Sequence, residues 1–143
     1  MIVKPAFSLL KFNYRRHGTH TCSMHFPNTC AIRMSEALVK TNKEFLDAFK
    51  KSGKNVCPHG YIRGAQDLAA VLAKAFGTRT HGWNAQPAYN SAPANAKGLE
   101  GIVCYMNIPS YPEGQGHIDL WEGDGPVGDE YWNAKTIWMW ELT

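Results

Sequence analysis

A cysteine at position 30 directly follows residues that can cap a helix. Asn28 or Thr29 can fill the cap position, and the chain from Cys30 to about Lys40 contains no glycine or proline, so a helix is expected to begin there. The free N–H groups and the dipole of a first helical turn favour negative charge and therefore the thiolate form of a cysteine. Because the thiolate is the nucleophile, Cys30 is a candidate nucleophile; an inert thiol at a helix start is the alternative.

A histidine at position 117 is the natural partner for this thiol. It follows Gly116 at the head of a segment in which apolar and polar residues alternate. Ile118 and Leu120 share one side of that expected strand, so His117 points to the other side. We interpret it as a general base, with a strand-edge histidine of no special role as the alternative.

A cysteine–histidine pair needs a third group to fix the imidazole tautomer and orientation. Asp119 has the same strand parity as His117, but its carboxylate is expected to run alongside the ring rather than behind it. Asp124 lies in a glycine-rich turn that explains it on structural grounds. Asp129 begins the next segment, where the chain can fold back beside the histidine. We therefore prefer Asp129 as the third group, with Asp124 second.

Asn28 is a candidate for binding the oxyanion of an acyl-transfer reaction. Its side-chain amide can donate a hydrogen bond together with the main-chain N–H of Cys30. Its alternative role is that of a helix cap.

The other cysteines and histidines do not have the spacing of a typical metal site. There is no C-x-x-C pair, and a zinc set drawn from Cys22, His25, Cys57 and His59 would need an uncommon arrangement of C-x-x-H followed by C-x-H. Cys104 lies within an apolar run, as a buried thiol would. We expect no metal and no cofactor.

Length and charge narrow the class of protein further. A chain of 143 residues predicts one domain, 1–143. The net charge is only +3, and basic residues are scattered rather than clustered, which argues against a nucleic-acid partner. No apolar run reaches the roughly 20 residues that a membrane-spanning helix needs, so no membrane insertion is expected.

The elements that must position these residues form two groups. Helices are expected at 30–40, 42–51 and 68–76, after an extended N-terminal segment, 1–29. Strands are expected at 101–108, 116–121 and 135–142, after a long surface loop, 78–98. Helices first and an antiparallel sheet last indicate an α+β fold.

Two stretches together resemble a known family. Asn28–Ser35 and Gly116–Trp121, in this order, are similar to the type VI secretion amidase effectors of the fourth family. Lys4–Phe7, Tyr61–Arg63 and Trp138–Leu142 are similar to family positions as well, so the resemblance covers about residues 4–142.

The resemblance implies a papain-like fold of the NlpC/P60 type and a cysteine amidase that acts on peptidoglycan. The implied catalytic residues are Cys30, His117 and Asp129, and the implied bond joins γ-D-glutamate to meso-diaminopimelate in the stem peptide. Two other functions stay open: a catalytically inactive module that binds the cell wall, and another papain-like acyl transferase.

The same resemblance implies how such a protein is delivered and restrained. The N-terminus lacks a signal-peptide pattern, as expected for a toxin injected into the periplasm of a rival bacterium. A cognate immunity protein is the implied partner. An oxidising destination permits at most one disulfide among Cys22, Cys57 and Cys104, because Cys30 must stay free.

Overall fold

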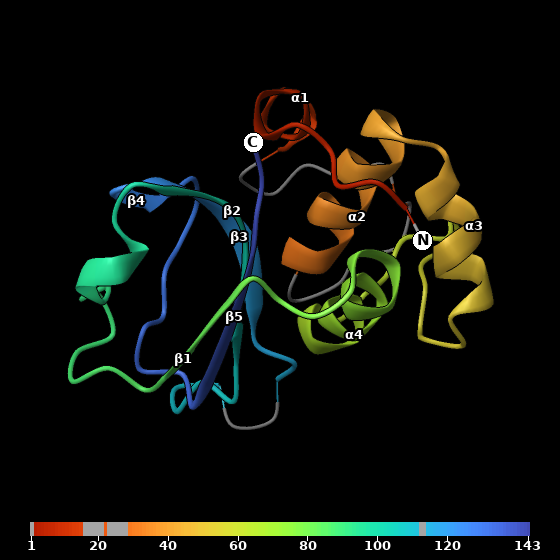
Figure 1. Cartoon of the computed structure of the whole chain (residues 1–143). Helices are drawn as coiled ribbons and strands as arrows, with labels where there is room; N and C mark the ends of the chain where they lie inside the picture. The colour runs from red at the N-terminus through yellow and green to blue at the C-terminus, as the bar shows by residue number, and fades with distance from the viewer. Residues whose placement is uncertain (1, 16–21, 23–28, 112–113) are drawn as a thin grey trace.

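The α-helices that the structure describes lie on one side of a five-stranded antiparallel sheet (Figure 1). The computed structural model describes residues 2–15, 22, 29–111 and 114–143. Its α-helices are α1 (Phe7–Asn13), α2 (Cys30–Thr41), α3 (Glu44–Lys51) and α4 (Ala65–Phe76). Its strands are β1 (His81–Asn84), β2 (Leu99–Met106), β3 (His117–Gly123), β4 (Gly125–Pro126) and β5 (Thr136–Glu141). The α+β fold expected from the sequence is confirmed.

Helix α2 lies at the centre of the molecule. Every residue from Cys30 to Leu38 is buried, because α1, α3, α4 and strand β3 all pack against it (Figure 1). A helix that is covered on all sides cannot shift without disturbing each of its neighbours. The position of Cys30, at its first turn, is therefore held by the core.

Helix α1 corrects the expectation that residues 1–29 are extended. Phe7 and Leu10, three residues apart, are buried, whereas Phe12 is exposed. With seven residues and two inward positions, this helix carries too short an apolar pattern to be recognised from the sequence. Its main chain is tied to the other end of the protein, since the Phe7 N–H donates to the carbonyl of Thr143 at 3.2 Å.

The sheet has the order β1-β5-β2-β3-β4, with every neighbouring pair antiparallel. Strand β2 lies in the middle and is buried from Gly101 to Met106, which explains its continuous apolar sequence. One face of the sheet packs on the helices and the other on an aromatic cluster that includes Trp121 and Trp132. In the register of β2 and β3, Tyr105 pairs with His117 and Val103 with Asp119.

The segment 78–98 is more regular than the expected surface loop. It contains strand β1 and a short 3₁₀ helix, Ala94–Ala96. Strand β1 forms because it pairs with β5, Gly82 opposite Trp138, and no local pattern in four residues predicts such a long-range pairing.

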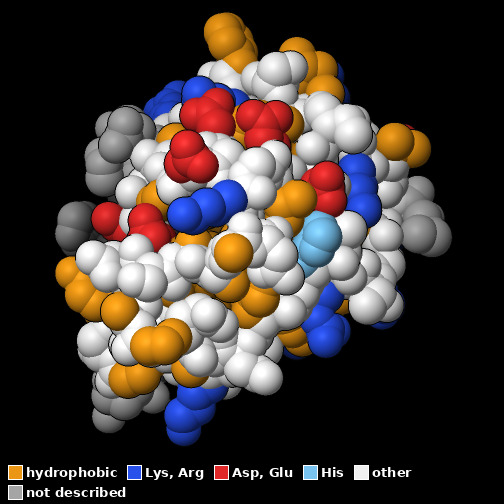
Figure 2. All heavy atoms as spheres, turned by 60° about the vertical axis from the view of Figure 1, so that its left-hand side comes forward, with side chains coloured by type: hydrophobic (Ala, Val, Ile, Leu, Met, Phe, Trp, Pro, Cys, Tyr) orange, Lys and Arg blue, Asp and Glu red, His pale blue; other side chains and the backbone are white. Residues whose placement is uncertain are grey.

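The surface carries mixed charge. On the face shown in Figure 2, lysine and arginine side chains are separated by neutral and acidic ones rather than gathered into one stripe. Among the helices that the structure describes, none has the length and apolar character needed to cross a bilayer.

Candidate active site

The first turn of α2 presents Cys30 at a well-held helix start. The Arg33 N–H donates to the carbonyl of Thr29 at 2.9 Å and so makes the first helical bond. The Arg33 guanidinium Nε donates to the Thr29 hydroxyl at 3.1 Å, so the cap residue is fixed by its side chain as well. Cys30 is not part of a disulfide, and only 1% of its surface is exposed.

Strand β3 begins with His117, and the preceding glycine lets it come close to β2. Gly116 has φ +93°, and a Cβ there would collide with the main-chain carbonyl of Tyr105. The Tyr105 ring consequently stacks on the imidazole of His117, with centroids 6.0 Å apart. The Tyr131 ring meets the same imidazole edge-on at 5.3 Å. Two aromatic rings thus fix the plane of His117.

The carboxylate that contacts His117 is that of Asp119. Its Oδ2 lies 2.8 Å from Nε2 of the imidazole, and only 1% of the residue is exposed. Three main-chain N–H groups, from Leu120, Gly128 and Asp129, donate to the same carboxylate at 2.8, 3.1 and 2.8 Å. These donors replace the water that a buried carboxylate loses, which is why Asp119 can lie in the interior.

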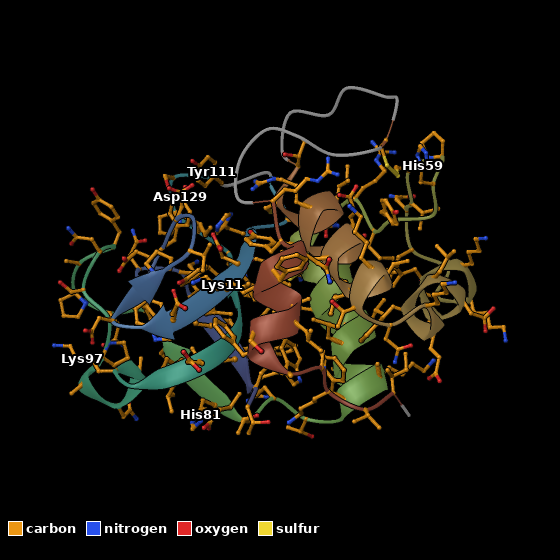
Figure 3. All side chains as sticks on the ribbon, turned by 90° about the horizontal axis from the view of Figure 1, so that it is seen from above. Lys11, His59, His81, Lys97, Tyr111 and Asp129 are labelled. Atoms are coloured by element: carbon orange, nitrogen blue, oxygen red, sulfur yellow. A yellow bond between two sulfur atoms is a disulfide. The ribbon has the colours of Figure 1, made fainter. Side chains whose placement is uncertain are left out.

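Asp129, the preferred third group of the sequence analysis, lies elsewhere. Its side chain is exposed (Figure 3), and it contacts the site through its main-chain N–H, which donates to Asp119. Asp124, the second choice, is exposed in the turn between β3 and β4. Asp119 contacts His117 because residues two apart on a strand project from the same face of the sheet, so its carboxylate reaches the imidazole from alongside.

The protonation of His117 follows from its neighbours. Burial alone would lower the pKa of His117, because the imidazolium loses hydration. The hydrogen bonds with Asp119 and Cys30, and the negative charge of both groups, outweigh burial and raise the pKa of His117 from 6.5 to about 10. The imidazole thus interacts with both the thiol and the carboxylate, a combination of groups suited to attack on a carbonyl carbon.

One further residue at this site was not found from the sequence. Tyr14 follows α1, is buried, and lies close to Asp119: burial raises the pKa of its hydroxyl, and the charge of Asp119 raises it further. Nothing in the sequence points to Tyr14, because the helix that places it was not recognised. Asn28, the expected oxyanion donor, lies outside the described residues.

A thiol at the start of a buried helix, beside a histidine on an antiparallel sheet, is the architecture of the papain-like hydrolase fold. Within that class the chain belongs to the family of type VI secretion system amidase effector protein 4 (Tae4), whose model matches residues 26–140. It is therefore an antibacterial amidase effector that acts on peptidoglycan.

Solved structures agree with the fold. The chain is similar to the effector in the Tae4–Tai4 effector–immunity complex from Salmonella Typhimurium, with a TM-score of 0.77 and 20% identity over 99% of this chain and 100% of that one. It is also similar to the effector in the Tae4–Tai4 complex from Enterobacter cloacae, with a TM-score of 0.72 and 17% identity over 99% and 100% of the two chains. No curated protein matches the chain.

Proposed function

We propose that the chain hydrolyses the amide bond between γ-D-glutamate and meso-diaminopimelate in peptidoglycan stem peptides, with Cys30, His117 and Asp119 as the catalytic group. The observation that carries this proposal is the 2.8 Å contact between His117 and Asp119, at an imidazole that also hydrogen-bonds with Cys30. Membership of the amidase effector family supports the reaction class and the polymer.

The first half of the reaction forms an acyl-enzyme. The sulfur of Cys30 attacks the carbonyl carbon of the γ-D-glutamyl group as a thiolate, beside the protonated imidazole of His117. A C–S bond forms and the C–N bond breaks, while His117 gives its proton to the departing amine of diaminopimelate. Asp119 holds the ring and stabilises its charged form throughout.

The second half releases the product. With its proton gone, His117 takes a proton from water as that water attacks the thioester carbon. The C–S bond breaks, the glutamyl carboxylate leaves, and the sulfur and the imidazolium return to their starting state. Water is the only co-reactant, so these two reaction steps need no metal and no redox change.

The oxyanion formed at each attack requires hydrogen-bond donors. The main-chain N–H of Cys30 lies in the first turn of α2, where N–H groups point out of the helix end, and it is proposed as one donor. Asn28 is proposed as the second. In other enzymes one such donor contributes about 3 kcal/mol to the stability of the transition state.

Purified Gram-negative sacculi test the proposal directly. The wild type should release fragments cut between D-glutamate and diaminopimelate, identified by mass spectrometry, and Cys30→Ala should release none. A cut at the diaminopimelate–D-alanine crosslink would overturn the assigned bond but keep the enzyme class. No fragments from folded wild type would favour a wall-binding module, and undiminished cutting by Cys30→Ala would remove Cys30 from the mechanism.

We also propose that this effector acts in the periplasm of the target cell and is neutralised by a cognate immunity protein. Peptidoglycan is reached from that compartment, and the similar effectors of Salmonella Typhimurium and Enterobacter cloacae were crystallised with the immunity protein Tai4. Expression of the effector with and without a periplasmic export signal in a susceptible host tests the first point, since only the exported form should lyse cells.

A further inference from the structure

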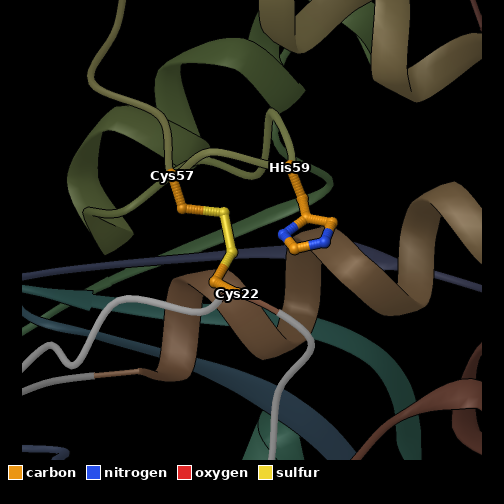
Figure 4. A group of neighbouring side chains, drawn as sticks. All are labelled: Cys22, Cys57 and His59. Carbon is orange, nitrogen blue, oxygen red and sulfur yellow. A yellow bond between two sulfur atoms is a disulfide. The ribbon is translucent and has the colours of Figure 1, made fainter.

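A second cluster of reactive side chains lies outside the candidate active site. Cys22, Cys57 and His59 each direct one ligand atom toward the others, and these three atoms all lie within 4.8 Å of one another (Figure 4). The two sulfur atoms are joined as a disulfide. His59 lies on the helical side of the molecule, well separated from Asp129 (Figure 3).

A tight turn holds two of these side chains in place. The N–H of Cys57 donates to the carbonyl of Tyr61 at 2.8 Å, and the N–H of Gly60 donates back to the carbonyl of Cys57 at 2.8 Å. Gly60 has φ +88°, a conformation in which glycine is strongly favoured. Cys57 and His59, two residues apart, are therefore fixed on one rigid loop, whereas Cys22 reaches them from the chain ahead of α2.

Burial divides the cluster into an inner and an outer part. Cys22 and Cys57 are 6% and 3% exposed and pack with Ile32 against Tyr61. His59 is exposed, and its ring stacks on Tyr61 with centroids 6.0 Å apart. The sulfurs are thus shielded from bulk solvent, while the imidazole faces the solution from which an ion would enter.

Two thiolates and an imidazole are donors that Zn²⁺ prefers. With Zn–S bonds of about 2.3 Å and Zn–N bonds of about 2.0 Å in tetrahedral geometry, the ligand atoms lie roughly 3.5–3.8 Å apart, which the present spacing reaches once the S–S bond is opened. We propose that in the reduced chain Cys22, Cys57 and His59 bind one Zn²⁺, with solvent as fourth ligand, and that the disulfide and the bound ion are alternative states of one site.

Oxidation exchanges one state for the other. The two thiolates give two electrons to a disulfide oxidant such as oxidised glutathione, form the Cys22–Cys57 bond and release Zn²⁺. The S–S bond of the oxidant breaks into two glutathione thiolates, which take up two protons. A disulfide sulfur is a poor ligand compared with a thiolate, so the oxidised chain loses the site. The sequence analysis did not favour a metal set here, because the spacing alone does not bring residues 22 and 57 together.

Cobalt(II) titration of the reduced protein tests the site without any measurement of activity. Cys30→Ala serves as the starting chain, so that the thiol beside His117 cannot contribute. One equivalent of Co²⁺ should produce thiolate-to-metal charge-transfer absorption that one equivalent of Zn²⁺ removes. His59→Ala in this background should weaken Zn²⁺ binding by at least about tenfold. His81→Ala, whose ring instead pairs with Glu141 at 2.8 Å, is the matched control and should not.

A second readout protects the test against misfolded variants. Zn²⁺ should raise the Tm of the reduced Cys30→Ala chain in a concentration-dependent way and leave that of the oxidised chain unchanged. The proposal is overturned if the folded, reduced chain shows no thiolate band and no Tm shift, if His59→Ala binds as tightly as its parent, or if oxidation leaves binding intact. None of these results bears on the proposed amidase reaction.

Discussion

The Asp119 carboxylate accepts hydrogen bonds from the ring that it orients and from the loop that follows β4. Its two oxygens accept from His117 and from the main-chain N–H groups of Leu120, Gly128 and Asp129. A carboxylate held by so many donors cannot rotate, and a fixed carboxylate is what keeps an imidazole in one tautomer. The geometry of the candidate site therefore depends on main-chain donors as well as on side chains.

Substitution separates the roles of the two aspartates. Asp119→Asn should lower kcat/KM on sacculi by about 10²–10⁴-fold, because an amide NH₂ would face N–H donors and would no longer stabilise the imidazolium. Asp129→Asn keeps its main-chain donor and should change kcat/KM little. An equal loss of kcat/KM in the two variants would indicate that the Asp129 side chain also orients the imidazole.

A methyl group at position 128 provides a finer test of the same carboxylate. A Cβ at Gly128 would collide with Oδ2 of Asp119, whereas one at Gly125 meets nothing within 4 Å. Gly128→Ala should displace the carboxylate and lower kcat by about 10²-fold, as small misplacements of catalytic groups do. Gly125→Ala is the matched control, and kcat measured on soluble muropeptides compares the two. A Gly128→Ala enzyme with normal kcat would show that Asp119 need not be held this closely.

At the scale of elements, α1 packs against α2, within the N-terminal segment that the sequence analysis expected to be extended. Leu10 is fully buried in the core against which α2 packs, and the Lys11 ammonium reaches the Glu122 carboxylate of β3 at 2.7 Å (Figure 3). Tyr14, next to Asp119, follows this helix directly. The helix thus joins the active-site side of the sheet to the helical core.

Truncation of one side chain measures how much the packing of α1 contributes to the free energy of unfolding. Leu10→Ala should lower the free energy of unfolding by about 2–4 kcal/mol, because it removes buried methyl groups and leaves a cavity. Phe12 on the same helix is 86% exposed, so Phe12→Ala should change it by no more than about 0.5 kcal/mol. Urea unfolding monitored by tryptophan fluorescence gives both values, and equal effects would mean that α1 does not pack as described.

The helices and strands with sustained periodicity were predictable from the sequence, and the short ones were not. The apolar spacing of α2 and α4 and the alternation in β3 locate Cys30 and His117 correctly. Helix α1 and strand β1 form through contacts with distant partners, the C-terminus and β5, which no local pattern contains. Asp119 was visible as a neighbour of His117 on one strand face, but its orientation depends on main-chain donors from the far side of a turn.

For the molecule as a whole, the proton on His117 links stability to pH. Its pKa is about 10 in the folded state and 6.5 in the reference state, so the folded protein binds this proton more tightly. The resulting stabilisation is complete below about pH 6.5, declines as the pH rises from there, and is lost above about pH 10.

Comparison with a variant isolates this contribution. The difference in unfolding free energy between wild type and His117→Asn should become less favourable to the wild type between about pH 6 and pH 9. Parallel urea titrations at several pH values measure the difference, in which the titration of other groups largely cancels. A difference that is constant across this range would mean that the pKa of His117 is the same in the folded and the unfolded states.

The sheet ends on both sides in its two shortest strands, β1 with four residues and β4 with two. Main-chain groups at a sheet edge are what one molecule offers to another when proteins aggregate by adding strands, and short edges offer few of them. The protein should accordingly not aggregate through its sheet edges at the high concentrations used for spectroscopy. Insertions that lengthen β1 or β4 would promote self-association of the protein through its sheet edges, so linkers and labels are better placed elsewhere.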